Sequence, residues 1–432
     1  MEASKPTSRN PWAWIPTLYF AQGIPYVVVM TVSVIMYKRL GISNADIALY
    51  TSWLYLPWVI KPLWSPFVDM FKTKRFWVVT LQSVIGVALA LVAFALPLPS
   101  FFQLTIAVFW LMAFASATHD IAADGFYMLS LEQHQQAAFS GVRSTFYRVA
   151  MITGQGILVV IAGTIETSSE GNIPLAWAVT FAILSALFLL FFGYHKFMLP
   201  YPASDQPTLR TASHGVVQEF LRTFALFFKK KDVLVILAFL LFYRFAEAQL
   251  IKLVQPFLLD PRDQGGLGLT TSEVGLVYGT VGVISLTLGG LLGGYVVSKK
   301  GLKFWLWIMV LSIHIPDAAF VYLSQVQPDN FLLISIAVGL EQFGYGFGFT
   351  AYMLYMIMIS EGEHKTAHYA ICTGFMALGM MLPGMFSGML QEMVGYKSFF
   401  LWVVISTIPG YIVPALVKID PQFARKSEAE KK

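Results

Sequence analysis

The sequence predicts an all-α membrane protein in which twelve transmembrane helices form two halves of six. Three observations predict this class: the 432-residue chain is 57% hydrophobic and only 12% charged, its apolar segments are of spanning length, and one long polar loop lies near the middle. An ordinary soluble domain has about 25% charged residues. A soluble fold with so little charge could not cover its surface, which excludes soluble enzymes, nucleic-acid binders and disordered proteins.

The apolar segments are each close to the length of about 20 residues that a helix needs to cross a bilayer. Short connections rich in Pro, Gly or charge separate them, such as Leu96–Ser100 and Gln327–Asn330. The predicted spans are Trp12–Tyr37, Ile47–Val68, Phe76–Leu96, Phe101–Met128, Gly141–Ile165, Leu175–Phe197, Val233–Leu259, Val274–Val297, Phe304–Leu323, Phe331–Ser360, Ala367–Leu390 and Ser398–Val417.

The basic residues set the predicted orientation. Most of the 29 Lys and Arg residues lie in loops and ends on the side of the N-terminus, and basic loops stay in the cytoplasm, so both termini are expected there. The net charge of +5 then follows from topology, and we expect lipid but no nucleic acid as a partner. The single cysteine, Cys372, excludes a disulfide framework and a cysteine metal cluster.

The long polar loop divides the chain into an N-terminal half, residues 1–197, a cytoplasmic linker, residues 198–232, and a C-terminal half, residues 233–432. Within the linker, apolar residues recur at helical spacing, which predicts an amphipathic helix lying in the membrane interface. A regulatory or partner-binding helix is the alternative. The apolar face consists of Val216, Val217, Phe220, Phe224 and Phe227.

The two halves resemble each other. The loop after the second span, Asp69–Trp77, and the loop after the eighth, Val297–Trp305, both end in a basic residue followed by Phe-Trp. Repeated six-helix halves are typical of secondary transporters, which bind substrate near mid-membrane where the repeats meet. The sequence contains no GxxxxGK loop, which argues against ATP-driven transport, and we expect no cofactor.

Charged residues inside the spans are the first candidates for function, because a charge at the bilayer centre costs about 2.5–3.5 kcal/mol or more. The fourth span carries Asp120 and Asp124, which share one helical face, and the fifth span brings Arg143 and Arg148 from the same side. The aspartates either couple protons or belong to a structural ion-pair group at the inner gate. His119 beside Asp120 does not indicate a metal site, because no further ligand spacing supports one.

The seventh span contains Tyr243, Arg244, Glu247 and Gln249 at considerable depth, and Tyr243, Arg244 and Gln249 are candidate substrate-binding residues. An arginine there suits an anionic substrate, whose carboxylate it would bind as a planar fork. Glu247 is then a candidate proton carrier. The alternative is a structural Arg244–Glu247 pair, since residues three apart on a helix can contact each other.

Two other spans supply candidates. Glu341 and Gln342 in the tenth span are a second proton site and a substrate contact, or else a helix-packing hydrogen bond. Gln22 and Tyr26 in the first span flank Gly and Pro residues that predict a kink, and they are candidate sugar ligands or helix-packing residues.

Three further charges inside the apolar segments are expected to be peripheral. Lys61 and Lys252 are predicted to snorkel to the membrane edge. Asp317 is predicted to face the outer vestibule.

Three motifs carry a family resemblance: FAQGIPY at Phe20–Tyr26, KPLWSPFVD at Lys61–Asp69 and ASATHDIAADGF at Ala115–Phe126. With them the chain resembles the major facilitator superfamily and, within it, the AmpG muropeptide permeases, a group similar also to acetyl-CoA transporters. The sequence departs from the family pattern at His119, where Gln is usual, and at Ile24, where Leu is usual.

The resemblance implies a major facilitator fold in a bacterial inner membrane and proton-driven import of cell-wall muropeptides or related amino sugars. It also implies an inner-gate ion-pair group that includes Asp69, Arg143 and Arg148. We expect a monomer with a small-molecule substrate and no catalytic or metal site. The alternatives are a transporter of another anionic or sugar solute, acetyl-CoA included, a membrane-embedded acyltransferase using His119 and Asp120, and a sensor derived from a transporter.

Overall fold

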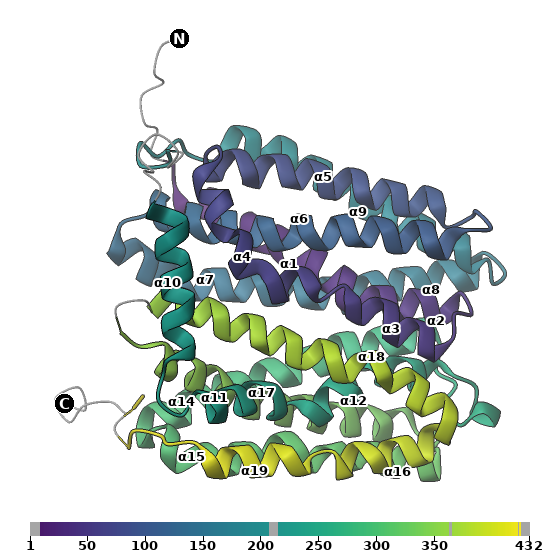
Figure 1. Ribbon diagram of the computed structural model, residues 1–432. Coiled ribbons are helices and arrows are strands. Elements are labelled where there is room, and N and C mark those ends of the chain that lie inside the picture. The colour runs from purple at the N-terminus through teal and green to yellow at the C-terminus, as the bar shows by residue number, and fades with distance from the viewer. Residues whose placement is uncertain (1–8, 207–214, 363–364, 422, 425–432) are drawn as a thin grey trace. The chain divides into compact units, whose positions relative to one another are not determined.

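The computed structural model describes residues 9–206, 215–362, 365–421 and 423–424, which form helices and turns and contain no strand (Figure 1). The helices of the first part of the chain are α1 (Ile15–Val27), α2 (Ser33–Arg39), α3 (Asn44–Trp53), α4 (Leu56–Met70), α5 (Lys74–Ala95), α6 (Phe101–Ser130), α7 (Gln133–Ile152), α8 (Leu158–Ser168) and α9 (Ile173–Met198). Those of the second part are α10 (Gly215–Phe228), α11 (Val233–Phe242), α12 (Phe245–Leu259), α13 (Thr271–Val274), α14 (Val283–Lys300), α15 (Leu302–His314), α16 (Ala318–Val326), α17 (Phe331–Ser360), α18 (Lys365–Ile405) and α19 (Ile408–Leu416).

Short segments of other helical types interrupt these helices. The 3-10 turns are η1 (Pro11–Ala13), η5 (Arg262–Gln264) and η7 (Ile315–Asp317), and the wider π-helical turns are η2 (Val28–Val32), η3 (Thr153–Ile157) and η6 (Gly275–Gly282). The kink predicted at Gly23 and Pro25 takes the form of η2, which begins three residues after the proline.

Ten helical segments of the described chain have the length and hydropathy of membrane spans, which confirms the predicted all-α membrane class. The predicted span Ile47–Val68 is divided between α3 and α4. The last two predicted spans lie within one segment, Ala367–Leu416, which turns at Gly395, where φ is 76°.

The chain folds as two compact units. The first comprises Met1–Met36 and Ile60–Gly215, and the second comprises Tyr37–Val59 and Val216–Lys432. Tyr37–Val59, which includes the first half of the second predicted span, therefore packs with the C-terminal part of the chain, most extensively through α3 against α18.

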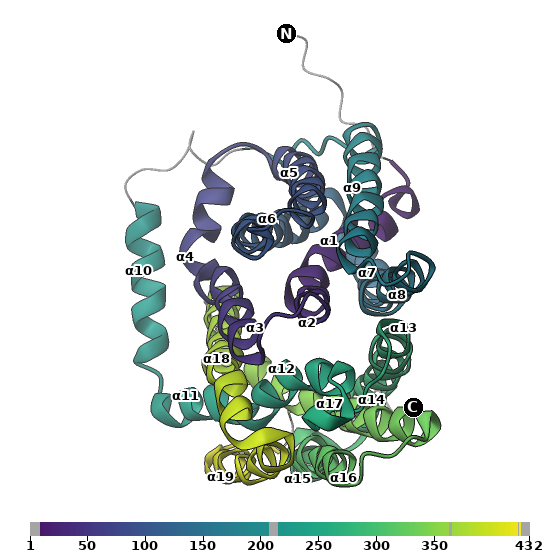
Figure 2. The same cartoon turned by 90° about the vertical axis from the view of Figure 1, so that its right-hand side faces the viewer.

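In the first unit, α5 packs between α6 and α9, and α1 packs on α7 (Figures 1 and 2). Polar side chains cap the N-terminal ends of two of these helices: Thr73 accepts a hydrogen bond from the Phe76 amide at the start of α5, and Asn172 accepts one from the Leu175 amide at the start of α9. Around the start of α1, Trp14 and Phe126 meet edge to face in the buried core, with ring centroids 5.3 Å apart.

In the second unit, α17 is central, because α14 and α15 both pack on it. Glycines permit the close approach: a Cβ atom on Gly346 would lie 2.0 Å from the Leu286 carbonyl oxygen, and one on Gly344 would lie 2.0 Å from the Ser312 carbonyl oxygen. The Gly-rich run of the tenth span therefore serves helix packing, as small residues do in membranes.

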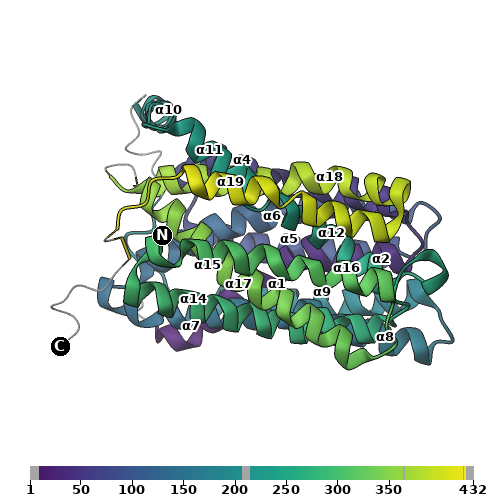
Figure 3. The ribbon, with the colours of Figure 1, turned by 90° about the horizontal axis from the view of Figure 1, so that it is seen from below.

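Helix α10, predicted to lie in the membrane interface, runs across the long axes of α11 and α19 (Figures 1 and 3). Its C-terminal end docks on the second unit: Phe227 is fully buried against His368 and Phe375, and the His368 ring contacts the Thr223 carbonyl at 3.3 Å. The side chains of residues 215–221, which include Val216, Val217 and Phe220, lie outside the described part of the chain.

Candidate functional site

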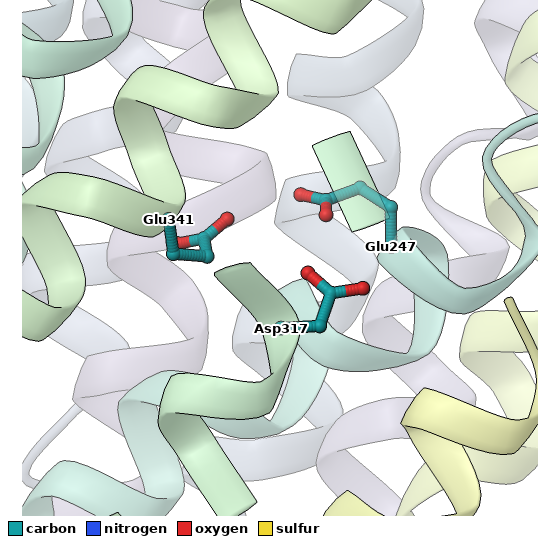
Figure 4. A group of neighbouring side chains, drawn as sticks. All are labelled: Glu247, Asp317 and Glu341. Atoms are coloured by element: carbon teal, nitrogen blue, oxygen red, sulfur yellow. The ribbon is translucent and has the colours of Figure 1, made fainter. Parts of the chain in front are cut away.

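Two broken spans and one continuous helix bring three carboxylates together inside the second unit. Glu247 lies in the first turn of α12, Asp317 ends the 3-10 turn η7, and Glu341 lies in the middle of α17. Their side chains are 0%, 1% and 1% exposed. One oxygen from each lies within 4.8 Å of the others, and the three groups point toward one another (Figure 4).

The local sequence explains this convergence. The seventh span breaks after α11, since Arg244 leaves the helical conformation (φ −112°, ψ 21°), and Glu247 therefore falls near the positive end of a new helix. The ninth span breaks at Ile315-Pro316-Asp317, because proline cannot continue the α-helical hydrogen bonds. Gly344, one turn from Glu341, lets α17 approach this second break.

The three carboxylates lack the hydrogen bonds that buried polar groups normally have. Both oxygens of Glu247, both oxygens of Asp317 and Oε1 of Glu341 have no hydrogen-bond partner, while Oε2 of Glu341 accepts from Gln342 Nε2 at 2.9 Å. Three ionised carboxylates this close in a buried place would repel one another strongly. The arrangement is therefore chemically suited to taking up protons or a cation.

The alternative of a structural Arg244–Glu247 pair is not what the structure shows, because both oxygens of Glu247 lack a hydrogen-bond partner. The Arg244 guanidinium donates to the Tyr345 hydroxyl and lies over the rings of Tyr345 and Phe349, 4.9 and 4.7 Å from their centroids. Aromatic faces attract a cation, and both rings belong to α17. Arg244 therefore contacts a neighbouring helix and not Glu247, which lies three residues further along its own span. Nε of Arg244 remains without a hydrogen-bond partner.

Two further predicted residues of the seventh span hold helices together. The Tyr243 hydroxyl donates to the Gly348 carbonyl oxygen at 2.9 Å. Gln249 accepts from Trp402 Nε1 at 2.8 Å and donates to Ser406 Oγ at 3.3 Å. Their polar groups are occupied by contacts with α17 and the end of α18.

The first unit contains a second group of charges, on α6. Asp120 pairs with Lys61 and accepts a hydrogen bond from Gln22, whereas Asp124 pairs with Arg143 at 2.7 Å. The two aspartates share one helical face, as predicted, but each has its own cation. The prediction that Lys61 snorkels to the membrane edge is wrong, because this ion pair offsets the cost of a charge within the span.

The remaining predicted residues of the first unit lie on α1, α7 and α4. Arg148 is half-buried on α7, and Tyr26 is half-buried one turn after Gln22. The side chain of Asp69 lies outside the described part of the structure.

A buried polar chain beside Asp120 was not predicted. Gln82 Nε2 donates to His119 Nε2 at 3.1 Å, Gln82 Oε1 lies 2.8 Å from His195 Nδ1, and His195 Nε2 lies 2.9 Å from Thr17 Oγ1. The chain joins four helices, and the departure from the family pattern at His119 is the sequence signal that could have indicated it.

Two other residues differ from their predictions because packing buries them. Asp317 was expected to face the outer vestibule but is 1% exposed within the carboxylate cluster. Lys252 was expected to snorkel but is 3% exposed, donates to Thr51 Oγ1 at 2.9 Å and lies over the Tyr55 ring.

Curated relatives match nearly the whole chain. The putative transporter AmpG 4 of Rickettsia conorii is 26% identical over 415 residues, covering 92% of this chain and 94% of that protein. The anhydromuropeptide permease of Escherichia coli K12 is 24% identical over 423 residues, covering 95% of this chain and 80% of that protein. The chain thus resembles AmpG transporters along almost all of its length.

Solved transporter structures share the fold. The nucleoside transporter NupG aligns with a TM-score of 0.70 at 17% identity, over 95% of this chain and all of that chain. The D-xylose–proton symporter aligns with a TM-score of 0.71 at 16% identity, over 96% and 99% of the two chains.

These relatives are transporters and permeases, which sets aside the acyltransferase alternative for His119 and Asp120. In the structure His119 is hydrogen-bonded to Gln82, and Asp120 forms an ion pair with Lys61. The family model described as Major Facilitator Superfamily matches residues 17–326. A chain that matches this model over well over half its length, with membrane-spanning helices throughout, is a multi-pass membrane protein and belongs to the Major Facilitator Superfamily.

Proposed function

We propose that the protein is a proton-coupled secondary transporter that imports cell-wall muropeptides or related amino-sugar and anhydro-sugar solutes by alternating access. The names of the AmpG relatives support the substrate class. The single observation that carries the coupling is the cluster of three buried carboxylates, in which five of the six oxygens have no hydrogen-bond partner.

In this proposal Glu247 and Glu341 take up protons on the outside and release them in the cytoplasm. Protonation removes the repulsion between the carboxylates and so stabilises a compact cluster, whereas loss of the proton favours a rearrangement of the helices that carry them. Both breaks that position the cluster, in the seventh and ninth spans, are places where such a rearrangement needs few backbone hydrogen bonds to change. Asp120 and Asp124 are secondary candidates, since each already has a cationic partner.

Arg244 is the proposed anchor for a substrate carboxylate. Its guanidinium lies over the rings of Tyr345 and Phe349, and its Nε has no hydrogen-bond partner, which suits a planar, bidentate contact. Gln22, Tyr26 and Gln342 are the proposed ligands for sugar hydroxyls. Nothing in this assignment requires a cofactor.

Two halves, residues 1–197 and 233–432, are proposed as the moving bodies, joined by the linker 198–232 that contains α10. We place both termini in the cytoplasm and the monomeric protein in the inner membrane, because basic residues dominate the loops on that side. Arg143, Arg148 and Asp69 are proposed inner-gate residues.

The test is uptake by purified protein in sealed proteoliposomes. An anhydro-muropeptide, a neutral amino sugar and acetyl-CoA are offered side by side under an imposed inward proton gradient. Accumulation of the muropeptide that collapses with a protonophore supports the proposal. Accumulation of acetyl-CoA instead would indicate a transporter of acetyl-CoA-like solutes. Tight muropeptide binding without flux would indicate a sensor.

A further inference from the structure

We propose that Glu247, Asp317 and Glu341 form a binding site for a sodium ion, which competes there with protons. The inference rests on the proposed function, because it concerns the ion that the same cluster takes up. The proposed transporter then has two alternative coupling ions at one place.

The donor set is the first argument. All three side chains offer oxygen, and hard cations such as sodium and calcium prefer oxygen ligands, whereas transition metals favour sites that include nitrogen or sulfur. Ions of calcium size bind oxygen at about 2.3–2.6 Å, so opposite ligands lie roughly 5 Å apart. Three carboxylate oxygens within 4.8 Å of one another fit around one such ion.

The second argument is independent of the spacing. Glu247 is completely buried, points into the cluster and has two oxygens without a hydrogen-bond partner, and the same holds for Asp317 at 1% exposure (Figure 4). Buried carboxylate oxygens are almost always hydrogen-bonded or coordinated. Four oxygens on two side chains that lack such partners are therefore available to coordinate a cation.

The backbone gives the third argument. Coupling ions in transporters bind where membrane helices are discontinuous, because the interrupted turns leave polar backbone groups for the ion. Two of the three carboxylates lie beside such interruptions, Glu247 after the break at Arg244 and Asp317 in the turn η7.

A monovalent ion fits better than a divalent one. A coupling ion has to leave the site in every cycle, and affinity for a divalent cation rises steeply with the number of carboxylate ligands. Arg244 acts electrostatically on Glu247, so the four groups carry two negative charges when all are ionised. One sodium ion and one proton neutralise them.

Two tyrosines and a histidine are the other ionisable groups near the cluster. Glu341 and Glu247 act electrostatically on Tyr278, and Asp317 acts on Tyr411. His314 lies one turn before Asp317 on α15, beside the rings of Tyr243 and Tyr411.

The binding test uses the full chain in detergent. The thermal midpoint Tm is measured against NaCl and against KCl at equal ionic strength, at pH 8 and at pH 5.5. Sodium is expected to raise Tm in a saturable manner, with an affinity at least about tenfold weaker at the lower pH. Equal effects of sodium and potassium, or an effect of calcium without one of sodium, would overturn the sodium site.

Variants locate the effect. Asp317→Asn and Glu341→Gln are both made, so that one folding failure does not decide the result, and size exclusion reports folding. Both are expected to lose the sodium shift, while Asp263→Asn, at an exposed position in η5, keeps it. A full sodium shift in folded Asp317→Asn and Glu341→Gln contradicts the assignment.

Transport separates this inference from the proposed function. If sodium has no more effect than potassium while proton-driven uptake persists, the sodium site fails and the proposed function stands. If sodium binds as expected but neither a proton nor a sodium gradient drives uptake, the site stands and the proposed function fails.

Discussion

Lys38 and Asp260 form a buried ion pair, with Nζ 2.6 Å from Oδ1 and side chains only 14% and 8% exposed. Lys38 belongs to the last turn of α2 and Asp260 directly follows α12, so the pair fastens the end of the first predicted span to the end of the seventh. The Tyr396 hydroxyl donates to the second oxygen of Asp260 at 2.6 Å, and Asn44 donates to the Tyr396 hydroxyl oxygen at 2.9 Å.

This pair predicts a stability effect. Lys38→Met leaves the buried carboxylate of Asp260 without its cation, and breaking a buried ion pair on one side costs about 3–5 kcal/mol. Lys38→Met is therefore expected to unfold at a clearly lower temperature in detergent. The double variant Lys38→Met/Asp260→Leu should recover part of the loss. Equal stability of Lys38→Met and the wild type would show that the pair contributes little.

Glu247→Gln is expected to abolish uphill proton-coupled uptake while substrate exchange across the membrane persists. The amide has the shape of the carboxyl group but cannot release a proton, so binding survives and coupling does not. Counterflow in proteoliposomes measures exchange, and uptake under an imposed gradient measures coupling. Unchanged uphill uptake by the variant would remove Glu247 from the mechanism.

Arg244→Lys keeps a positive charge but loses the planar guanidinium that lies over the rings of Tyr345 and Phe349. We expect it to weaken uptake of a substrate with a carboxylate about tenfold or more, as loss of one charged hydrogen bond does, and to affect a neutral sugar much less. The comparison is the ratio of the KM values for the two substrates. Equal losses for both would indicate that Arg244 serves only to hold α17.

Gly344→Ala is expected to impair folding, because its Cβ atom would lie 2.0 Å from the Ser312 carbonyl oxygen and 2.9 Å from Pro316. Separating α17 from the ninth span moves Asp317 away from Glu341, and overpacking of this kind costs about 1–3 kcal/mol or more. Gly294→Ala on α14 is the matched control, since nothing lies within 4 Å of its Cβ position. Thermal unfolding and the yield of monodisperse protein report the difference.

Arg143→Gln removes the partner of Asp124. The pair is about one third exposed, so the expected loss of stability is small, about 0.5–1 kcal/mol. The exchanged variant Asp124→Arg/Arg143→Asp should regain part of it if the contact is a simple ion pair. If the exchanged variant is stable but does not transport, Asp124 has a role beyond its ion pair with Arg143.

The fold was predictable because a bilayer imposes length and composition on each span. The predicted segments coincide with helical parts of the structure, but several are divided. Proline explains the break in the ninth span, whereas the break of Ile47–Val68 at Leu54 and Tyr55 was not predicted. Helix type within a span was less predictable: nothing in the sequence analysis indicated the π-helical turn Gly275–Gly282.

The partners of the charged residues were much harder to predict. Spacing along a helix suggested Arg244 with Glu247, but Tyr345 and Phe349 of another helix hold the guanidinium. Asp317 joined the carboxylates only because a proline turn and Gly344 bring two distant segments together. Such contacts depend on which helices are neighbours, and spacing along the chain does not show this.

The side-chain amide of Gln82 makes the two buried imidazoles dependent on each other. While its nitrogen faces His119 and its oxygen faces His195, His119 carries its proton on Nδ1 and His195 carries one on Nδ1. If His119 gained a proton on Nε2, two donors would face each other, and the Gln82 amide would have to rotate by about half a turn. Its nitrogen would then face His195 Nδ1, so His195 would have to carry its proton on Nε2, which faces Thr17. Rotation of a single amide would thus couple protonation of His119 on α6 to the tautomer of His195 on α9.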